Sequence, residues 1–298
     1  MNDRWQELMV FARVAECGSF SRAARELHMS QPSVSRIVRE LEDRLGVKLL
    51  LRTTRHLSLT DAGALLLERA RQVMADWEAA EDAARGVDSL RGVLRIALPV
   101  VYGTRAVIPV LPDFVADNPD LHVEITISDE RQNLVVDGID VAIRVGAQED
   151  SVFGARRIAT LRRMLVATPA YLDRRGRPAS PAALAGHDCI LGHGTFGRES
   201  WKFEKDGTVV SVDVQTRFQI NSAPGILAAA VAGLGIAMVS NVMAGDELAA
   251  GLLEQVLPDY EMGETDIYAV LPGGPRPSRK VRAFVDYLAA RIGRDVSS

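Results

Sequence analysis

One short segment near the N-terminus restricts the possible folds of this chain most strongly, because its apolar residues follow a strict helical pattern. They fall at i, i+3, i+4, i+7 and i+11, namely Val34, Ile37, Val38, Leu41 and Leu45, the spacing of a stripe buried along one side of an α-helix. Ser30 suits the N-cap, Pro32 the first turn and Gly46 the end of this helix. The other face carries polar and basic residues, namely Gln31, Ser33, Ser35, Arg36 and Arg39. The sequence therefore predicts a helix over 31–45 with one packed face and one polar face.

Two shorter helical patterns precede this segment. The first is marked by Leu8, Phe11, Ala12 and Ala15 and ends at Cys17-Gly18, and the second, capped by Ser21, carries Ala23, Ala24 and Leu27. Two short helices joined by a tight turn are typical of a helix-turn-helix, whose second helix enters the major groove of DNA. There a glutamine can pair with adenine, an arginine with guanine, and a serine with bases or phosphates. The pattern alone leaves open a three-helix bundle with a solvated face.

The segment after the third helix favours DNA binding. Leu49–Leu51 and Leu57–Leu59 flank a basic stretch, which predicts a β-hairpin wing with Arg52 and Arg55 near its tip. These two arginines could contact phosphates or the minor groove. Residues 1–60 hold 10 Lys and Arg against 7 Asp and Glu, although the whole chain has a net charge of -4. A polyanion is therefore expected at the N-terminal end.

The run SFSRAARELHMSQPSVSRIVRELEDRLGVKLLLRTTRHLSLTDAG, residues 19–63, resembles the DNA-binding signature of LysR-type transcriptional regulators. The matching motifs are Ala23-Ala24, Ser30-Gln31-Pro32-Ser33, Leu41-Glu42, Leu45-Gly46 and Thr60-Asp61-Ala62-Gly63, with Ser35, Leu50 and Arg52 in place. The resemblance implies that Gln31, Pro32, Ser35 and Arg36 face bases. It also implies that Ser33, Arg39, Arg52 and Arg55 mainly contact the DNA backbone.

A long helix is predicted from about Asp61 to Val87, capped by Thr60. Its apolar positions are spaced 4, 3, 4, 3, 4 and 3, namely Leu66, Ala70, Val73, Trp77, Ala80, Ala84 and Val87, which is a heptad seam. We interpret the seam as a dimer contact that matches a two-fold operator, and the resemblance implies the same role. The alternative is packing against the chain's own winged domain. Residues 85–89 are the expected hinge.

Strand and helix patterns alternate in the remaining two thirds of the chain. Strands are expected near 93–98, 121–127, 140–145, 163–167, 213–220, 236–240 and 266–271, and helices near 104–116, 169–173, 222–232 and 279–292. This alternation predicts open parallel sheets with helices on both faces. The stretches LRIALPVVYG, DVAIRVG, LVATPAYL and AAAVAGLGIAMV resemble the effector domain of the same family, which is similar to a type 2 periplasmic binding protein.

The resulting domain prediction has three parts: a winged helix-turn-helix at 1–60, a linker helix and hinge at 61–91, and an α/β effector domain of two lobes at 92–298. The resemblance assigns 92–161 and 267–298 to the first lobe and 162–266 to the second. Ligands in open α/β sheets lie beyond the carboxyl ends of strands, and helix N-termini there favour carboxylates. The candidate effector-binding residues are Val101, Tyr102, Gly103, Thr104, Ser128, Arg144, His193, Trp201, Asn221 and Ser222. We therefore hypothesise a small organic anion as the effector.

Three of these positions leave alternatives open. Many relatives carry Ser or Thr early in the first strand–helix turn, where this chain has valines, so Tyr102 or Thr104 could substitute or the ligand could be more apolar. Arg144 could instead form a surface ion pair. Trp201 could instead be packed in a core or at its edge.

Other classes of protein fit less of the sequence. None of the five histidines lies in HExxH, and GxSxG and Walker A motifs are absent, so we do not expect an enzyme. A solute-binding protein would leave the first ninety residues unexplained, and an architectural DNA-binding protein would leave the lobes unexplained. Cys17 and Cys189 lie outside any CxxC pair, so no metal and no cofactor is expected.

We therefore expect a bacterial, cytoplasmic regulator without a membrane partner. Its expected partners are double-stranded promoter or operator DNA, a small-molecule effector, RNA polymerase, and further copies of itself as a dimer or a pair of dimers. Ligand would close the lobes and reorient the winged domains, which requires that it bind one arrangement better than the other.

Overall fold

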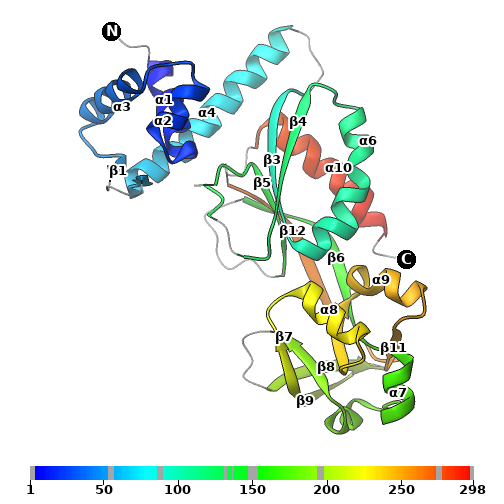
Figure 1. Ribbon diagram of the computed structural model, residues 1–298. Helices are drawn as coiled ribbons and strands as arrows, with labels where there is room; N and C mark the ends of the chain where they lie inside the picture. The colour runs from blue at the N-terminus through cyan, green and yellow to red at the C-terminus, as the bar shows by residue number, and fades with distance from the viewer. Residues whose placement is uncertain are drawn as a thin grey trace.

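The computed structural model describes residues 4–52, 57–85, 90–130, 133–135, 137–146, 154–192, 198–272 and 277–295. Figure 1 shows a small N-terminal domain, which we call the head, a long helix that leaves it, and an elongated α/β domain built of two lobes. This arrangement confirms the predicted fold class. No helix in the described ranges is both long enough and apolar enough to cross a membrane.

The head contains the predicted helix-turn-helix and wing. Helices α1 (Arg4–Cys17), α2 (Phe20–Glu26) and α3 (Gln31–Leu45) are followed by strands β1 (Leu50–Arg52) and β2 (Leu57–Leu59), which pair antiparallel. Ser30 caps α3 by accepting from Ser33 N, and Gly46 ends it in the left-handed conformation at φ 71°. The predicted cap of α2 was wrong: Ser19, not Ser21, accepts from Arg22 N. Ser21 therefore lies inside the first turn of α2.

A buried carboxylate joins α3 to the wing. Glu42 accepts from Leu49 N at 2.9 Å and from Leu50 N at 3.2 Å, and Lys48 Nζ lies 2.6 Å from its other oxygen. Burial opposes ionisation of Glu42, but these hydrogen bonds outweigh it and lower the pKa of the carboxyl group. Glu42 therefore fixes the start of the wing against the end of α3.

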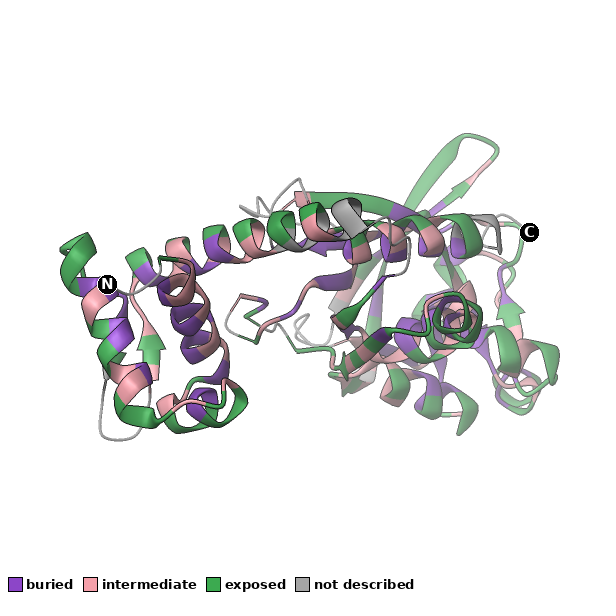
Figure 2. Ribbon diagram, turned by 90° about the horizontal axis from the view of Figure 1, so that it is seen from above, coloured by how far each residue is buried: buried purple, intermediate pink, exposed green. Residues whose placement is uncertain are grey.

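Helix α4 (Asp61–Arg85) starts against the wing. Thr60 Oγ1 accepts from Gly63 N at 3.0 Å and donates to Lys48 O at 2.7 Å. The helix passes so close to the residue before β1 that a Cβ atom at Gly63 would lie 2.0 Å from Leu49 O. Buried positions on α4 fall at its end nearest the head (Figure 2). The last two residues of the predicted helix and the predicted hinge after Arg85 fall in 86–89, which lie outside the described ranges.

The α/β domain contains one mixed sheet. Its strands are β3 (Gly92–Leu98), β4 (Leu121–Ile127), β5 (Val141–Val145), β6 (Gly154–Ala167), β7 (Cys189–Gly192), β8 (Arg198–Lys205), β9 (Thr208–Ile220), β10 (Ile236–Ser240), β11 (Glu254–Val256) and β12 (Glu264–Leu271). Their order is β4-β3-β5-β12-β6-β10-β7-β9-β8, with β11 also paired to β6. The expected parallel pairing is found for β3 with β4 and β5, and for β7 with β9 and β10. It was wrong for other pairs, because β12 runs antiparallel to β5 and β6, β10 and β11 run antiparallel to β6, and β8 runs antiparallel to β9.

Strand β6 belongs to both lobes (Figure 1). Its first part pairs with β12 in lobe I, and its last residues pair with β10 and β11 in lobe II. Arg163 N donates to Gly263 O at 3.1 Å, where the chain returns from lobe II to lobe I. The two crossings between the lobes therefore lie side by side.

Helices cover the lobes unequally. The helical segment starts at α5 (Val100–Tyr102), before the predicted start at 104. The predicted helix itself is broken into a π-helical turn (Gly103–Val107), a 3-10 turn (Ile108–Val110) and α6 (Leu111–Ala116), because Pro109 and Pro112 lack backbone N–H donors. Together with α10 (Arg279–Asp295), this segment packs on one face of lobe I, and Leu134 and Ile139 contribute to a cluster on the other face. Lobe II is covered by α7 (Pro169–Arg175), a 3-10 turn (Pro181–Gly186), α8 (Ala223–Val231) and α9 (Asn241–Ala249).

Candidate DNA-binding surface and effector site

The N-terminal half of α3 presents the predicted DNA-binding residues to solvent. Gln31, Pro32, Arg36 and Arg39 are exposed, and Ser33 and Ser35 are half-buried. Arg36 Nη1 donates to Glu40 Oε1 at 2.9 Å, one turn further along the helix. The hydroxyl groups of Ser33 and the cap residue Ser30 lie 2.8 Å apart, so Ser33 takes part in capping. Because the opposite face of α3 is packed in the head, this surface is held rigidly.

The wing residues are described less fully. Arg52 ends β1 opposite Leu57, and only its backbone is described. Arg55 lies outside the described residues.

The predicted dimer seam on α4 divides into two parts. Ala70 is buried in the core of the head and Leu66 packs against that core. These two positions therefore pack against the chain's own winged domain, which was the alternative to a dimer contact. Val73 and Trp77 are 49% and 55% exposed, although both are large apolar residues, and Ala80 is also exposed. The side chain of Ala84 is not described, and Val87 lies outside the described residues. The exposed part of the seam is therefore the stretch from Val73 to Ala80.

The first strand–helix turn of lobe I is tightly packed. Gly103 allows this packing, since a Cβ atom there would lie 2.7 Å from Leu98 Cβ. Thr104 Oγ1 donates to Val100 O at 2.8 Å, within its own helical segment. Val100 N donates to Asp129 Oδ1 at 2.9 Å. The Asp129 carboxylate thus already accepts from one of the N–H groups at which an anion was predicted to bind.

Two aromatic candidates lie in hydrophobic cores. Tyr102 is 3% exposed in lobe I and Trp201 is 2% exposed in lobe II. In the described part of the chain, neither the Tyr102 hydroxyl nor the Trp201 indole N–H has a hydrogen-bond partner. Burial raises the pKa of Tyr102. We therefore remove both side chains from the candidate effector set, because packing explains their positions.

The other effector candidates are divided between the lobes. Ser128 Oγ accepts from Glu130 N at 3.1 Å after β4. Arg144 is half-buried on β5, in register with Tyr268 of β12. Asn221 is exposed, and Ser222 caps α8 by accepting from Gly225 N at 3.2 Å. His193 lies outside the described residues.

The contact between the lobes involves residues that the sequence reasoning missed. Arg105, in the π-helical turn of lobe I, donates to both carboxylate oxygens of Glu247 on α9, at 2.7 and 2.8 Å, and to Met243 O at 2.7 Å. Val101 packs against the lobe II cluster that contains Met243. Such two-pronged arginine–carboxylate pairs are strong and directional. Arg105 and Glu247 are 142 positions apart, so no local pattern links them.

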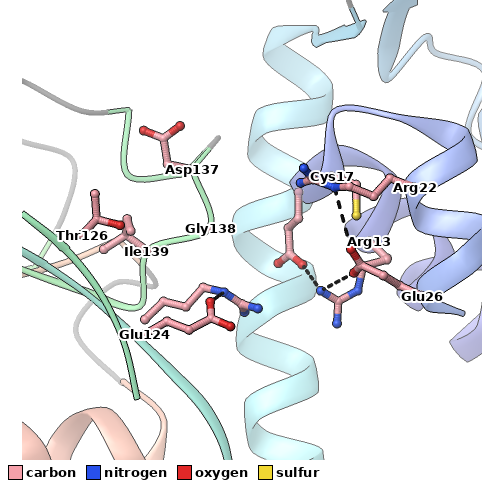
Figure 3. Close-up of a pocket in the computed structure, with 11 residues that line it drawn as sticks. Arg13, Cys17, Arg22, Glu26, Glu124, Thr126, Asp137, Gly138 and Ile139 are labelled. Atoms are coloured by element: carbon pink, nitrogen blue, oxygen red, sulfur yellow. Dashed lines mark hydrogen bonds and ion pairs between the residues drawn. The ribbon is translucent and has the colours of Figure 1, made fainter. Parts of the chain in front are cut away.

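The head also contacts lobe I, since Val135 of lobe I packs against the core of the head. Arg71 on α4 donates from Nε to Glu16 Oε1 of α1 at 3.1 Å, which joins the long helix to the head. Between the two domains lies a cavity of about 350 Å³. Figure 3 shows Arg13 and Glu26 of the head facing Asp137 and its neighbours of lobe I across it.

A folded helix-turn-helix with a wing, joined by a long helix to two α/β lobes, defines the class of DNA-binding proteins that carry a separate ligand-binding domain. Residues 5–64 match the family described as "Bacterial regulatory helix-turn-helix protein, lysR family", and residues 88–293 match "LysR substrate binding domain". The chain therefore belongs to the LysR-type transcriptional regulators. It is a DNA-binding transcription regulator with an effector-binding domain, not an enzyme, and regulators of this family form oligomers.

Relatives match along almost the whole chain. An "HTH-type transcriptional regulator" of Xanthomonas campestris pv. campestris (strain 8004) is 34% identical over 294 residues, covering 97% of this chain and 86% of the relative. The regulator CrgA of Neisseria meningitidis serogroup C (strain 8013) is 34% identical over 300 residues, covering 99% of each chain. The solved structure of CrgA, a LysR-type transcriptional regulator from Neisseria meningitidis, matches with a TM-score of 0.60 and 32% identity, covering 98% of this chain and 99% of that chain.

Proposed function

We propose that α3 reads promoter DNA in the major groove, with Gln31, Pro32, Ser35 and Arg36 toward the bases and Ser33, Arg39, Arg52 and Arg55 toward the backbone. The observation that supports this most directly is the exposed polar face at the start of α3, held by a buried opposite face. Arginine at such a position recognises guanine through two hydrogen bonds. The protein would act in the cytoplasm, where its DNA and RNA polymerase are found.

The test is binding of the full-length protein to DNA upstream of its own gene, with competitor DNA and a salt series. Arg36→Ala should lose specific binding, whereas Arg282→Ala, which removes the same charge from an exposed site on α10, should not. If random-sequence selection also recovers no preferred site for the wild type, with and without candidate effectors, the proposal is wrong.

We further propose that the effector is a small organic anion held between the lobes near Val101, Gly103, Thr104, Ser128, Arg144, His193, Asn221 and Ser222. Arg144 and the capped start of α8 supply the positive charge and N–H groups that favour a carboxylate. Asp129 opposes an anion at the first turn of lobe I, so the ligand carboxylate would lie nearer Arg144 or α8. Calorimetry with aromatic and aliphatic acids tests this assignment, and binding of neutral or cationic compounds alone would exclude it.

The proposed oligomer is a dimer, or a pair of dimers, joined through α4. The exposed Val73 and Trp77 support a contact with a second copy, since large apolar side chains favour burial. Two copies would place two reading helices on a two-fold operator. Effector binding would then alter the relative orientation of the heads by favouring one arrangement of the lobes.

A further inference from the structure

A hydrogen bond joins the two helices of the helix-turn-helix at the DNA-binding surface. Ser21 Oγ on α2 donates to Gln31 Oε1 at the start of α3, at 3.1 Å. Both residues are exposed and ten positions apart. Because Ser19 caps α2, the hydroxyl of Ser21 is not needed for the cap and is available to Gln31.

This contact holds the Gln31 side chain against α2. A glutamine amide has an acceptor oxygen on one side and a donor NH₂ group on the other. With Oε1 turned to Ser21 on α2, Nε2 lies on the side of the amide away from Ser21. A glutamine that pairs with adenine must present both groups to the base. Because Oε1 has two lone pairs, it can accept from Ser21 and from a base at the same time, while Nε2 donates.

We propose that Ser21 is a positioning residue that sets the base preference of Gln31. Held in this position, Gln31 is preorganised to pair with adenine, donating from Nε2 to N7 and accepting at Oε1 from N6. This inference rests on the proposed function, because it requires that α3 read bases. It adds a residue outside α3 to those that determine the operator sequence.

The test is selection of preferred sites from randomised DNA by the full-length protein and four variants: Ser21→Ala, Ser21→Thr, Gln31→Ala, and the double variant of Ser21→Ala with Gln31→Ala. In Ser21→Ala the preference for adenine at one position of each half-site should weaken by about three- to tenfold. The other positions should not change. Ser21→Thr keeps the hydroxyl and should keep the wild-type preference.

The double variant separates positioning from direct contact. If Ser21 acts through Gln31, Ser21→Ala should have no effect in the Gln31→Ala background, and the salt dependence of binding should be unchanged. Loss of a direct phosphate contact by the Ser21 hydroxyl would instead weaken binding about equally for all sequences, in either background. Ser21→Ala should fold normally, since the site is exposed and alanine favours helix.

The possible outcomes distinguish the role of Ser21 from the proposed reading of DNA by α3. A wild-type site with an unchanged profile in Ser21→Ala would overturn the role of Ser21 and leave DNA reading intact. An equal effect of Ser21→Ala in both backgrounds would also overturn it. A wild type that selects no site would overturn the proposed function, and the positioning role with it.

Discussion

The buried carboxylate of Glu42 allows a prediction of how firmly the wing is held. Glu42→Ala removes the acceptor of two backbone N–H groups, those of Leu49 and Leu50, in a buried part of the head. An unsatisfied buried donor costs about 1–3 kcal/mol, so the loss for two donors, partly relieved by water, is about 2–4 kcal/mol. Glu42→Gln keeps an acceptor oxygen and loses the charge facing Lys48, so it should cost about 1 kcal/mol.

Hydrogen exchange of the peptide that covers residues 46–52 measures this local effect in the full-length protein. Exchange there should accelerate about 30- to 1000-fold in Glu42→Ala, since 1.4 kcal/mol corresponds to a factor of ten. Exchange in α10 should stay constant. Equal exchange rates in Glu42→Ala and Glu42→Gln, or less than a threefold change in Glu42→Ala, would refute the reasoning.

The same group gives a pH dependence. Because the folded pKa of Glu42 is lowered, its ionisation contributes stability above the unfolded pKa of about 4.3. That contribution is lost as the pH falls through the folded pKa. Protection of residues 46–52 in the wild type should therefore fall on acidification below about pH 4.3, and the fall should be smaller in Glu42→Gln.

Three further predictions concern the other contacts. Trp77→Asp should weaken self-association at least tenfold in sedimentation experiments, because it puts a charge on the exposed seam; unchanged association would show that this seam is not the dimer contact. Arg105→Ala should destabilise the lobe contact by about 1–3 kcal/mol and lower the unfolding midpoint. Glu247→Gln should lower the midpoint by the same amount, because the pair acts as a unit, and clearly different losses would contradict this. Asp129→Asn should raise the affinity for an organic anion in calorimetry, since it removes a negative charge beside Val100 N, and a lower affinity would contradict the proposed electrostatics.

The head could be predicted because its signals are local. The stripe of α3, its Ser30 cap and its Gly46 end all lie within one helix. The assignment of the α2 cap to Ser21 failed because Ser19 also lies near the helix start, and only backbone geometry shows which serine reaches the third N–H.

The α/β domain was harder to predict, because its decisive contacts are distant in sequence. Only the end of β6 was predicted, since its first part carries arginines and lacks an apolar run. Strands β7, β8 and β11 and helix α9 were missed. Tyr102 and Trp201 could not be placed from sequence, since an aromatic residue suits a ligand site as well as a core. The pair Arg105–Glu247 depends on how the lobes are packed together.

The chain crosses between the lobes at two adjacent points, and this allows lobe II to be exchanged between related regulators. Since Arg163 N bonds directly to Gly263 O, the chain leaves lobe I and returns to it at neighbouring points. Lobe II is thus an insertion between two paired strands, β6 and β12. Residues 164–262 form one continuous cassette, which could be exchanged between relatives without breaking a strand pair of lobe I.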